Sequence, residues 1–284
     1  MRTEKPSNTA RKVALNIVTL GAKRGMKDVL PPGIVDVTAK LLVESGAVGQ
    51  RAVRFSRSRM AVGIYLAFDW MMPGQFEAFA HRKAFFERQV RNGIEAGASQ
   101  VLVLGAGYDT LGWRLAPEFS RVNFFEIDRP ATARLKAKGI ESMGKPTNLY
   151  LIAEDLGERQ LVDVLHADTT WNSIAPTVIV AEGLLMYLPP EAVGALFEQC
   201  AATTGAGSRI AFTYVGKRPN GTPDAGPWTW LVLWLLRVGG EPWLWSISAD
   251  DLCPFLNEHD WTTADDRKES SGKCGIEFHG IAVK

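Results

Sequence analysis

The chain has 284 residues, 46% of them hydrophobic, so it is long and apolar enough to bury a substantial core. Its 32 basic and 31 acidic residues leave a formal net charge of +1, which excludes the strongly basic surface typical of nucleic-acid-binding proteins. Three cysteines without CxxC spacing and four scattered histidines predict neither a metal site nor a disulfide framework. No apolar run resembles a secretion signal or is long enough to cross a bilayer. We therefore expect a cytoplasmic protein with small-molecule partners.

The first hundred residues have the pattern of helices. Between residues 73 and 97, apolar side chains recur at intervals of three, four or seven, a spacing typical of an amphipathic helix. Arg82 occupies an exposed-looking position among these apolar residues. The periodicity alone would therefore leave Arg82 on a solvated helix face.

Six short runs rich in β-branched and apolar residues follow, and helix-length segments separate the first five. Near-continuous apolar strands are typical of a parallel sheet covered on both faces, so we expect the first five runs to form such a sheet. We expect the last run, which closes the chain, to pair antiparallel. The predicted strands are 100–105, 121–128, 148–156, 177–183, 208–215 and 276–283.

The first predicted strand ends in a glycine-rich turn within "VLVLGAGYDT", residues 101–110. Gly105 and Gly107 allow close approach of the backbone to a ligand, and a helix starting near Thr110 would offer it unpaired amides. Asp128 follows about 20 residues later at the end of the second strand, where a carboxylate can accept both hydroxyls of a ribose. Each feature alone is ambiguous, because glycines also serve ordinary turns and Asp128 could cap a helix. Together they predict a site for a nucleotide-like ligand.

Two ligands fit a glycine-rich loop followed by an acid, namely a dinucleotide such as NAD and S-adenosylmethionine. The dinucleotide fingerprint needs a third glycine at the position that Thr110 holds here. Tyr187 is followed four residues later by Glu191 rather than by the lysine of short-chain dehydrogenases. The residues therefore favour S-adenosylmethionine, with an NAD-type oxidoreductase as the alternative.

Acidic residues also follow the third and fourth predicted strands. Asp155 could accept a hydrogen bond from an adenine amino group while Leu156 covers the ring, although Asp155 could also cap the helix that follows. Glu182 leaves an apolar strand at the edge where open α/β sheets bind ligands. A carboxylate there needs a partner or water, so a buried ion pair with a basic side chain is the alternative to a ligand contact.

Five blocks of sequence, in this order, resemble the leucine carboxyl methyltransferase family, including its bacterial members that act on polyketides and other small acids. The blocks are "VLVLGAGYDTLGWRL", "FFEIDRP", "AEDL", "AEGLLMYLPPE" and "GEPWLWSISADDLCPFLNEHDW". The resemblance runs from about Arg82 to the C-terminus. It implies the class I methyltransferase fold, an α/β Rossmann-like parallel sheet with an antiparallel last strand, helices on both faces and a helical N-terminal extension. It also implies S-adenosylmethionine as the cofactor.

The resemblance assigns cofactor contacts residue by residue. By position, one arginine holds the cofactor's carboxylate, two glycines lie beneath its methionine part, and one acid binds the ribose. Two further residues match the adenine site, and another acid lies near the amino acid moiety. In that order the residues are Arg82, Gly105 and Gly107, Asp128, Asp155 and Leu156, and Glu182.

The sequence departs from the family in two places. Members often have an arginine or another polar residue where this chain has Leu111 and Gly112, and the first hundred residues match poorly. Because members differ in substrate in that first part, the identity of the substrate cannot be transferred. We expect residues 1–98 to form a helical extension and substrate cap, and residues 99–284 to form one compact S-adenosylmethionine-binding domain.

The expected reaction is O-methyl transfer to the carboxylate of a small hydrophobic or aromatic acid. A carboxylic acid with a pKa near 4 is ionised at pH 7, so its attack on an electrophilic methyl group needs alignment rather than a base. A phenol would need a base, for which Tyr187 and His259 are weak candidates, and no catalytic residue is assigned. A non-catalytic nucleotide-binding protein is a further alternative.

Residues 226–245 form a tryptophan-rich segment after the fifth predicted strand. Three interpretations stay open, namely core packing, a lid that lines an apolar pocket, and contact with a membrane surface. Little basic charge lies beside the segment in the sequence, which argues against the membrane contact. The oligomeric state is not predicted.

Overall fold

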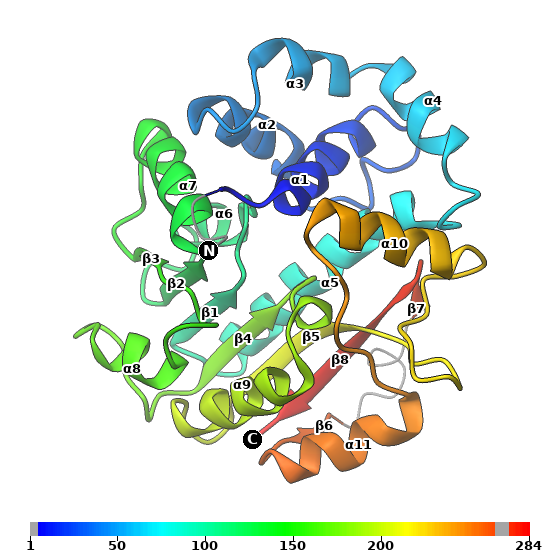
Figure 1. Cartoon of the computed structure of the whole chain (residues 1–284). Helices are drawn as coiled ribbons and strands as arrows, with labels where there is room; N and C mark the ends of the chain where they lie inside the picture. The colour runs from blue at the N-terminus through cyan, green and yellow to red at the C-terminus, as the bar shows by residue number, and fades with distance from the viewer. Residues whose placement is uncertain (1–4, 265–272) are drawn as a thin grey trace.

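The structure is a computed structural model that describes residues 5–264 and 273–284. Helices fill the chain before the first strand, and strands alternate with helices afterwards (Figure 1). The helices before the first strand are α1 (Asn8–Leu20), α2 (Ile34–Glu44), α3 (Gln50–Ser56), α4 (Arg59–Ala67) and α5 (Gln75–Glu95). The later helices are α6 (Leu111–Leu115), α7 (Pro130–Met143), α8 (Leu161–His166), η1 (Leu185–Tyr187), α9 (Pro190–Ala202), α10 (Thr229–Gly239) and α11 (Ala249–Glu258).

One mixed sheet runs through the molecule in the order β3-β2-β1-β4-β5-β8-β6, with β7 paired to β8. Its strands are β1 (Gln100–Leu104), β2 (Asn123–Asp128), β3 (Leu149–Ala153), β4 (Thr177–Ala181), β5 (Arg209–Val215), β6 (Thr262–Thr263), β7 (Lys273–Cys274) and β8 (Glu277–Val283). The first five pair parallel and β8 pairs antiparallel to β5, which confirms the expected sheet. The two-residue strands β6 and β7 are too short to leave a pattern in the sequence.

Alternate strand residues point to opposite sides of the sheet, so both of its faces are apolar and both are covered by helices. On one side, Val101 and Val103 of β1 pack with Phe86 and Val90 of α5. On the other side, Leu102 of β1 packs in a second core with residues of α8, α9 and α11. This alternation places the long helix α5 directly against the centre of the sheet.

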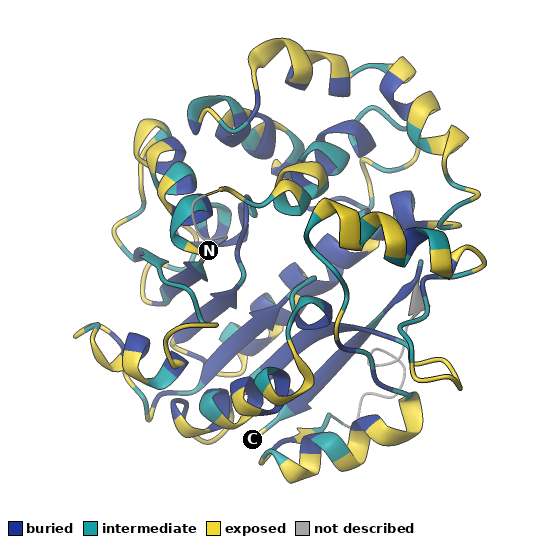
Figure 2. Ribbon diagram, in the orientation of Figure 1, coloured by how far each residue is buried: buried dark blue, intermediate teal, exposed yellow. Residues whose placement is uncertain are grey.

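The helices α1 to α4 form a layer beyond the C-terminal ends of the parallel strands (Figure 1). Their core includes Ile17 of α1, Ile34 of α2 and Val62 of α4, which cluster with Phe76 near the start of α5. Since the later part of α5 packs on the sheet, this helix connects the helical layer to the α/β layers. The sheet is buried, whereas the outer sides of α3, α4 and α10 are exposed (Figure 2). Within the described residues no helix is both long and apolar enough to span a bilayer.

Candidate cofactor site

The glycine-rich loop after β1 leaves little room for a side chain at its two glycine positions. Gly105 and Gly107 have φ values of +64° and +49°, in the left-handed region that strains other residues. A Cβ atom on Gly105 would lie 2.9 Å from Leu184, and one on Gly107 would lie 3.0 Å from Ala10 at the start of α1. The loop is therefore a cradle of bare backbone between the end of the sheet and the helical layer.

Asp128, the last residue of β2, lies beside this loop. Its carboxylate accepts hydrogen bonds from the amides of Gly107 at 2.5 Å and Arg129 at 2.7 Å. Burial raises its pKa, and the Gly107 amide and Lys136 act in the opposite direction. Arg129 is the N-cap residue of α7, which has no side-chain cap, so Asp128 does not cap that helix. The structure thus brings together the glycine loop and the acid that the sequence spacing paired.

Asp109 is a member of the site that the sequence reasoning missed. Its Oδ1 atom accepts hydrogen bonds from the amides of Thr110 at 2.6 Å and Leu111 at 3.2 Å. The expectation of unpaired amides at this helix start is therefore wrong, because the chain supplies its own acceptor. Burial would raise the pKa of Asp109, but Lys83, Lys136 and Arg114 hold it at about 2.

Arg82 is only 5% exposed, so the solvated position suggested by periodicity is wrong. Its Nε donates to Glu182 at 2.9 Å, and its Nη1 donates to both carboxylate oxygens of Glu277 at 2.8 and 2.9 Å. Burial alone would lower the pKa of Arg82, but the two carboxylates raise it. Nη2 has no hydrogen-bond partner among the described residues. Glu277, at the start of β8, could have been noticed as the charged residue in an otherwise apolar strand.

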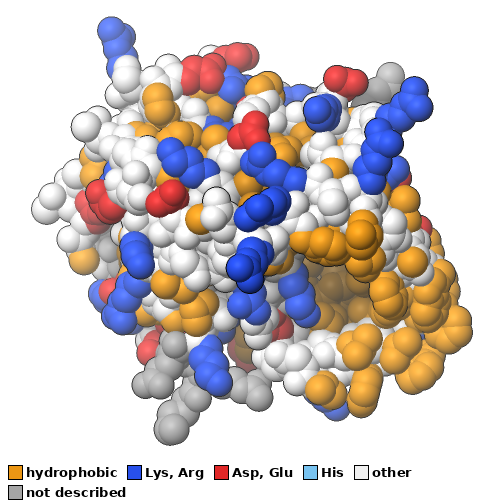
Figure 3. Space-filling view, turned by 90° about the horizontal axis from the view of Figure 1, so that it is seen from above, with side chains coloured by type: hydrophobic (Ala, Val, Ile, Leu, Met, Phe, Trp, Pro, Cys, Tyr) orange, Lys and Arg blue, Asp and Glu red, His pale blue; other side chains and the backbone are white. Residues whose placement is uncertain are grey.

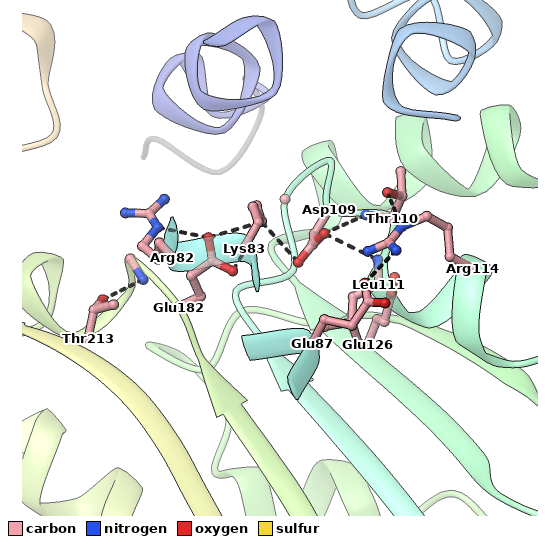
Figure 4. Close-up of polar contacts among 12 residues, drawn as sticks. Arg82, Lys83, Glu87, Asp109, Thr110, Leu111, Arg114, Glu126, Glu182 and Thr213 are labelled. Atoms are coloured by element: carbon pink, nitrogen blue, oxygen red, sulfur yellow. Dashed lines mark hydrogen bonds and ion pairs between the residues drawn. The ribbon is translucent and has the colours of Figure 1, made fainter. Parts of the chain in front are cut away.

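Lys83 extends this cluster towards the glycine loop. Its Nζ lies 3.0 Å from Glu182 and 3.1 Å from Asp109. A continuous row of charges therefore runs from Arg82 through Glu182 and Lys83 to Asp109 (Figure 4). Glu182 lies in a buried ion pair with basic side chains, which was the alternative to a ligand contact. The only sequence signal for Lys83 is its position next to Arg82.

Asp155 lies at the end of β3 beside an open cavity of about 410 Å³. Its Oδ1 accepts a hydrogen bond from Gly157 at 2.9 Å, and α8 begins only at Leu161, so Asp155 does not cap a helix. Leu156 is half-buried and packs against the core. The cavity lies by the ends of β2 and β3, and its lining is Pro130, Ala131, Arg134, Glu154, Asp155, Glu158 and Arg159.

The departure from the family pattern at Gly112 has a packing reason. A Cβ atom there would lie 2.6 Å from Glu126 Oε1 and 3.0 Å from Leu149. Glu126 is buried in β2 and lies 2.6 Å from Lys136 of α7. A larger residue at position 112 would therefore displace this buried ion pair.

The two weak base candidates differ in location. His259 lies 3.1 Å from Glu198 on the face covered by α9 and α11, away from the charged row. Tyr187 is near the row, but burial, together with Glu277 and Glu241, raises its pKa, and Trp243 and Arg82 act in the opposite direction. Neither residue has the properties of a catalytic base at this site.

Glu241, after α10, connects the tryptophan-rich segment to the start of α1. Its carboxylate accepts hydrogen bonds from Ser7 Oγ at 2.8 Å, from the Thr9 amide at 3.1 Å and from the Thr9 hydroxyl. Since Ala10 lies against Gly107, α1 and the segment after α10 meet over the glycine loop. Segments far apart in the sequence thus cover one side of the site.

Two mycobacterial proteins are similar in sequence to about half of this chain. A protein of Mycobacterium marinum named "Putative S-adenosyl-L-methionine-dependent methyltransferase" is 32% identical over 153 residues, which cover 53% of this chain and 48% of the relative. One of Mycobacterium ulcerans with the same name is 36% identical over 141 residues, covering 49% and 46%. The chain thus spans about half the length of these relatives.

Solved structures share the fold. A crystal structure from Thermobifida fusca, described as that of "a putative methyltransferase", has a TM-score of 0.59 and 18% identity, covering 92% of this chain and 97% of that chain. PigF, solved with SAH, has a TM-score of 0.50 and 14% identity, covering 76% and 62%. The class I methyltransferase fold expected from the sequence is confirmed. The names of these relatives refer to S-adenosyl-L-methionine, the cofactor that the sequence predicts for this chain.

The model of the family described as "Leucine carboxyl methyltransferase" matches residues 18–201. This match spans more than half of the chain and includes α5, the glycine loop, Asp128 and Glu182. The chain therefore belongs to the leucine carboxyl methyltransferase family.

Proposed function

We propose that this chain is an S-adenosylmethionine-dependent O-methyltransferase that converts the carboxylate of a small hydrophobic or aromatic acid into a methyl ester. The observation that carries the proposal is the 2.5 Å hydrogen bond between the Gly107 amide and Asp128. It fixes an acid beside a backbone cradle at the C-terminal edge of a parallel sheet, where such folds bind nucleotides. The name of the family supports a carboxylate as the methyl acceptor.

The residues present fit the cofactor. Gly105 and Gly107 would lie beneath its methionine part, and Asp128 would accept the ribose hydroxyls. Asp155 and Leu156 border the cavity beside β3 and would hold the adenine. When bound, S-adenosylmethionine supplies an electrophilic methyl group.

The charge of the buried row suits the amino acid end of the cofactor. Arg82 and Lys83 are outnumbered by the carboxylates of Glu182, Glu277 and Asp109. The cofactor carries two cationic groups, the sulfonium and the ammonium, and one carboxylate, so an excess of negative charge complements it. The Nη2 donors of Arg82 would hold the cofactor's carboxylate, with Glu182 near the ammonium group.

The chain needs little further machinery for the proposed reaction. An ionised acid requires alignment with the methyl group but no proton transfer. Arg82 is held by Glu182 and Glu277, so its position is fixed before the cofactor binds. Burial of the charged row keeps water away from these groups and strengthens their interactions. The protein's contribution is therefore to orient two ligands and exclude water.

We infer that the substrate side of the site is apolar. The face that carries α4 and α10 is hollowed, and hydrophobic side chains border the hollow (Figure 3). We propose that residues 1–98 form the substrate cap over the methyltransferase domain of residues 99–284, although α5 also packs on the sheet. An apolar entrance beneath such a cap favours a hydrophobic or aromatic acid over a sugar or a polar amino acid.

Methyl-labelled cofactor tests the proposal directly. The chain is incubated with labelled S-adenosylmethionine and a panel of aliphatic and aromatic carboxylic acids, with matched alcohols and phenols as controls. A carboxyl methyltransferase yields a product that releases labelled methanol in mild alkali, because esters hydrolyse and ethers do not. A base-stable product would assign a hydroxyl acceptor instead.

Calorimetry distinguishes the remaining alternatives. We expect binding of S-adenosylmethionine and S-adenosylhomocysteine and none of NAD. Binding of NAD alone would favour the oxidoreductase. Cofactor binding without turnover on any acid or hydroxyl compound would favour a non-catalytic protein.

A further inference from the structure

Exposed large hydrophobic side chains are concentrated in two segments. Within the described residues, all but Ile174 and Leu244 fall between residues 55 and 70 or between 228 and 238. The first segment contributes Phe55, Met60, Ile64, Leu66, Phe68 and Trp70, and the second contributes Trp228, Trp230, Trp234, Leu235 and Val238. Such a concentration on a folded surface is typical of an interaction site.

The two segments form one surface although they are far apart in the sequence. Trp70 and Trp228 pack edge to face with ring centroids 5.2 Å apart. Just behind them, Met71 and Met72 pack with Val232 of α10. Hydrophobic side chains accordingly gather on the side of the molecule that carries α4 and α10 (Figure 3). We call these exposed residues of α3, α4 and α10, with Phe68, Trp70 and Trp228, the apolar face.

The apolar face is flanked by arginines, and Asp69 is the one acidic residue within its two segments. Residues 45–68 include Arg51, Arg54, Arg57 and Arg59, all exposed, and neither aspartate nor glutamate. Helix α10 adds the exposed Arg237 and likewise has no acidic residue. Among the described residues only Arg57 of these five has an ion pair, with Asp36 at 2.8 Å. Folding therefore supplies the basic charge that the sequence neighbours of the tryptophan-rich segment lack.

We propose that the apolar face binds the surface of an anionic lipid bilayer. Exposed Trp, Phe and Leu side chains on short helices bury in the interfacial layer, where indole rings are favoured. Arginines around them pair with anionic headgroups and add to the binding. The hollow bordered by hydrophobic side chains would then open towards the bilayer, from which an amphipathic acid could enter.

The charge distribution argues against a second copy of the chain as the partner. A two-fold contact through the apolar face would place the same patch on both sides. The arginines Arg51, Arg54 and Arg59 of both copies would then meet in one interface, in which Asp69 is the only acidic residue of the two segments. Like charges juxtaposed in this way oppose association.

Vesicle binding tests the proposal with the full chain. Co-sedimentation is measured with vesicles of phosphatidylcholine alone and of phosphatidylcholine mixed with phosphatidylglycerol. We expect binding to the mixed vesicles and about tenfold or more weaker binding to the neutral ones. Trp230→Ser with Trp234→Ser should weaken binding to the mixed vesicles by about tenfold or more. Arg51→Gln with Arg54→Gln should remove most of the preference for the anionic lipid.

Matched controls are available on the same chain. Ile174→Ser changes an 81% exposed hydrophobic residue outside the apolar face, and Arg121→Gln changes an exposed arginine outside it. Both should bind the mixed vesicles like the wild type. Retained binding of S-adenosylhomocysteine by every variant verifies that the fold is intact.

Three results would overturn the proposal. The first is the absence of wild-type binding to the mixed vesicles, and the second is an equal loss of binding in the control and test variants. The third is a stable dimer in light scattering that the tryptophan variants dissociate, because the apolar face would then be an interface between copies.

Discussion

Arg82 on α5 and Glu277 on β8 are joined by two hydrogen bonds of 2.8 and 2.9 Å across 195 residues of sequence. Both side chains are buried, and Gln75 of α5 also donates to Glu277 at 3.1 Å. The pair therefore fastens α5, which connects the helical layer to the sheet, to the strand β8. It also fixes the guanidinium group beside Glu182 at the end of β4.

Replacing Glu277 with Ala should lower the free energy of unfolding by about 3–5 kcal/mol, because it leaves a buried guanidinium with only one carboxylate partner. Glu277→Gln keeps a hydrogen-bond acceptor and should cost less. Urea unfolding of both variants measures the difference. A loss below about 1 kcal/mol in the Ala variant would mean that water or a rearranged side chain replaces the carboxylate.

Replacing Asp128 with Ala should weaken binding of S-adenosylmethionine and S-adenosylhomocysteine at least tenfold. The variant would lose the hydrogen bonds proposed between Asp128 and the ribose, and bonds to a charged group contribute roughly 1.5–3 kcal/mol each. It also loses the hydrogen bond that Asp128 accepts from the Gly107 amide, which holds the glycine-rich loop in place. Calorimetry measures both dissociation constants, with Asp28→Ala, a change in an exposed turn, as the control. Unchanged affinity in a folded Asp128→Ala protein would remove this acid from the site.

His279 predicts how stability changes at mildly acidic pH. It is 5% exposed and stacks on Phe85, and burial, together with Arg82 and Arg88, lowers its pKa from 6.5 to about 4. The unfolded chain therefore takes up a proton that the folded chain resists. This residue's contribution to stability is complete above pH 6.5 and is lost as the pH falls towards 4.

We expect the wild type to lose roughly 2 kcal/mol of unfolding free energy through His279 between pH 7 and pH 4.5. His279→Phe keeps an aromatic ring against Phe85 and removes a buried ring nitrogen, Nε2, that has no hydrogen-bond partner in the part of the chain that the structure describes. Its unfolding free energy should fall less over the same range. Parallel pH profiles for the two proteins would contradict the assignment.

The sequence predicted the sheet well because hydrophobic periodicity is a local property. It also paired Gly107 with Asp128, since the ends of neighbouring parallel strands meet at one edge of the sheet. The sequence could not predict the ion pair between Arg82 and Glu277, because Glu277 lies near the other end of the chain. Periodicity could only describe Arg82 as polar on an apolar helix, and polar residues on helices are usually exposed.

The sequence could not predict the apolar face either, because segments far apart in the chain form it. The tryptophan-rich segment carries few basic residues of its own, so its sequence argues against membrane contact. The packing of Trp70 against Trp228, and of Met71 and Met72 against Val232, brings α10 next to the segment that follows α4. Interpretations that depend on neighbours in space, rather than along the chain, need the fold first.

The role proposed for Arg82 can be separated from its structural role with a conservative change. Arg82→Lys keeps the charge but loses the planar donor geometry, so it should bind S-adenosylmethionine more weakly than the wild type does. Decarboxylated S-adenosylmethionine lacks the group that Arg82 would hold. It should bind the wild type and the variant with nearly equal, weak affinity.

Glu277→Gln is the matched structural control, because it weakens the same buried pair while leaving the guanidinium in place. This variant should still bind S-adenosylmethionine more tightly than the decarboxylated analogue, whereas Arg82→Lys should lose most of that preference. If Arg82→Lys weakens both cofactors equally, or neither, Arg82 only supports the fold. Recognition of the cofactor's carboxylate would then pass to Lys83, whose Nζ lies 3.0 Å from Glu182 in the same row of charges.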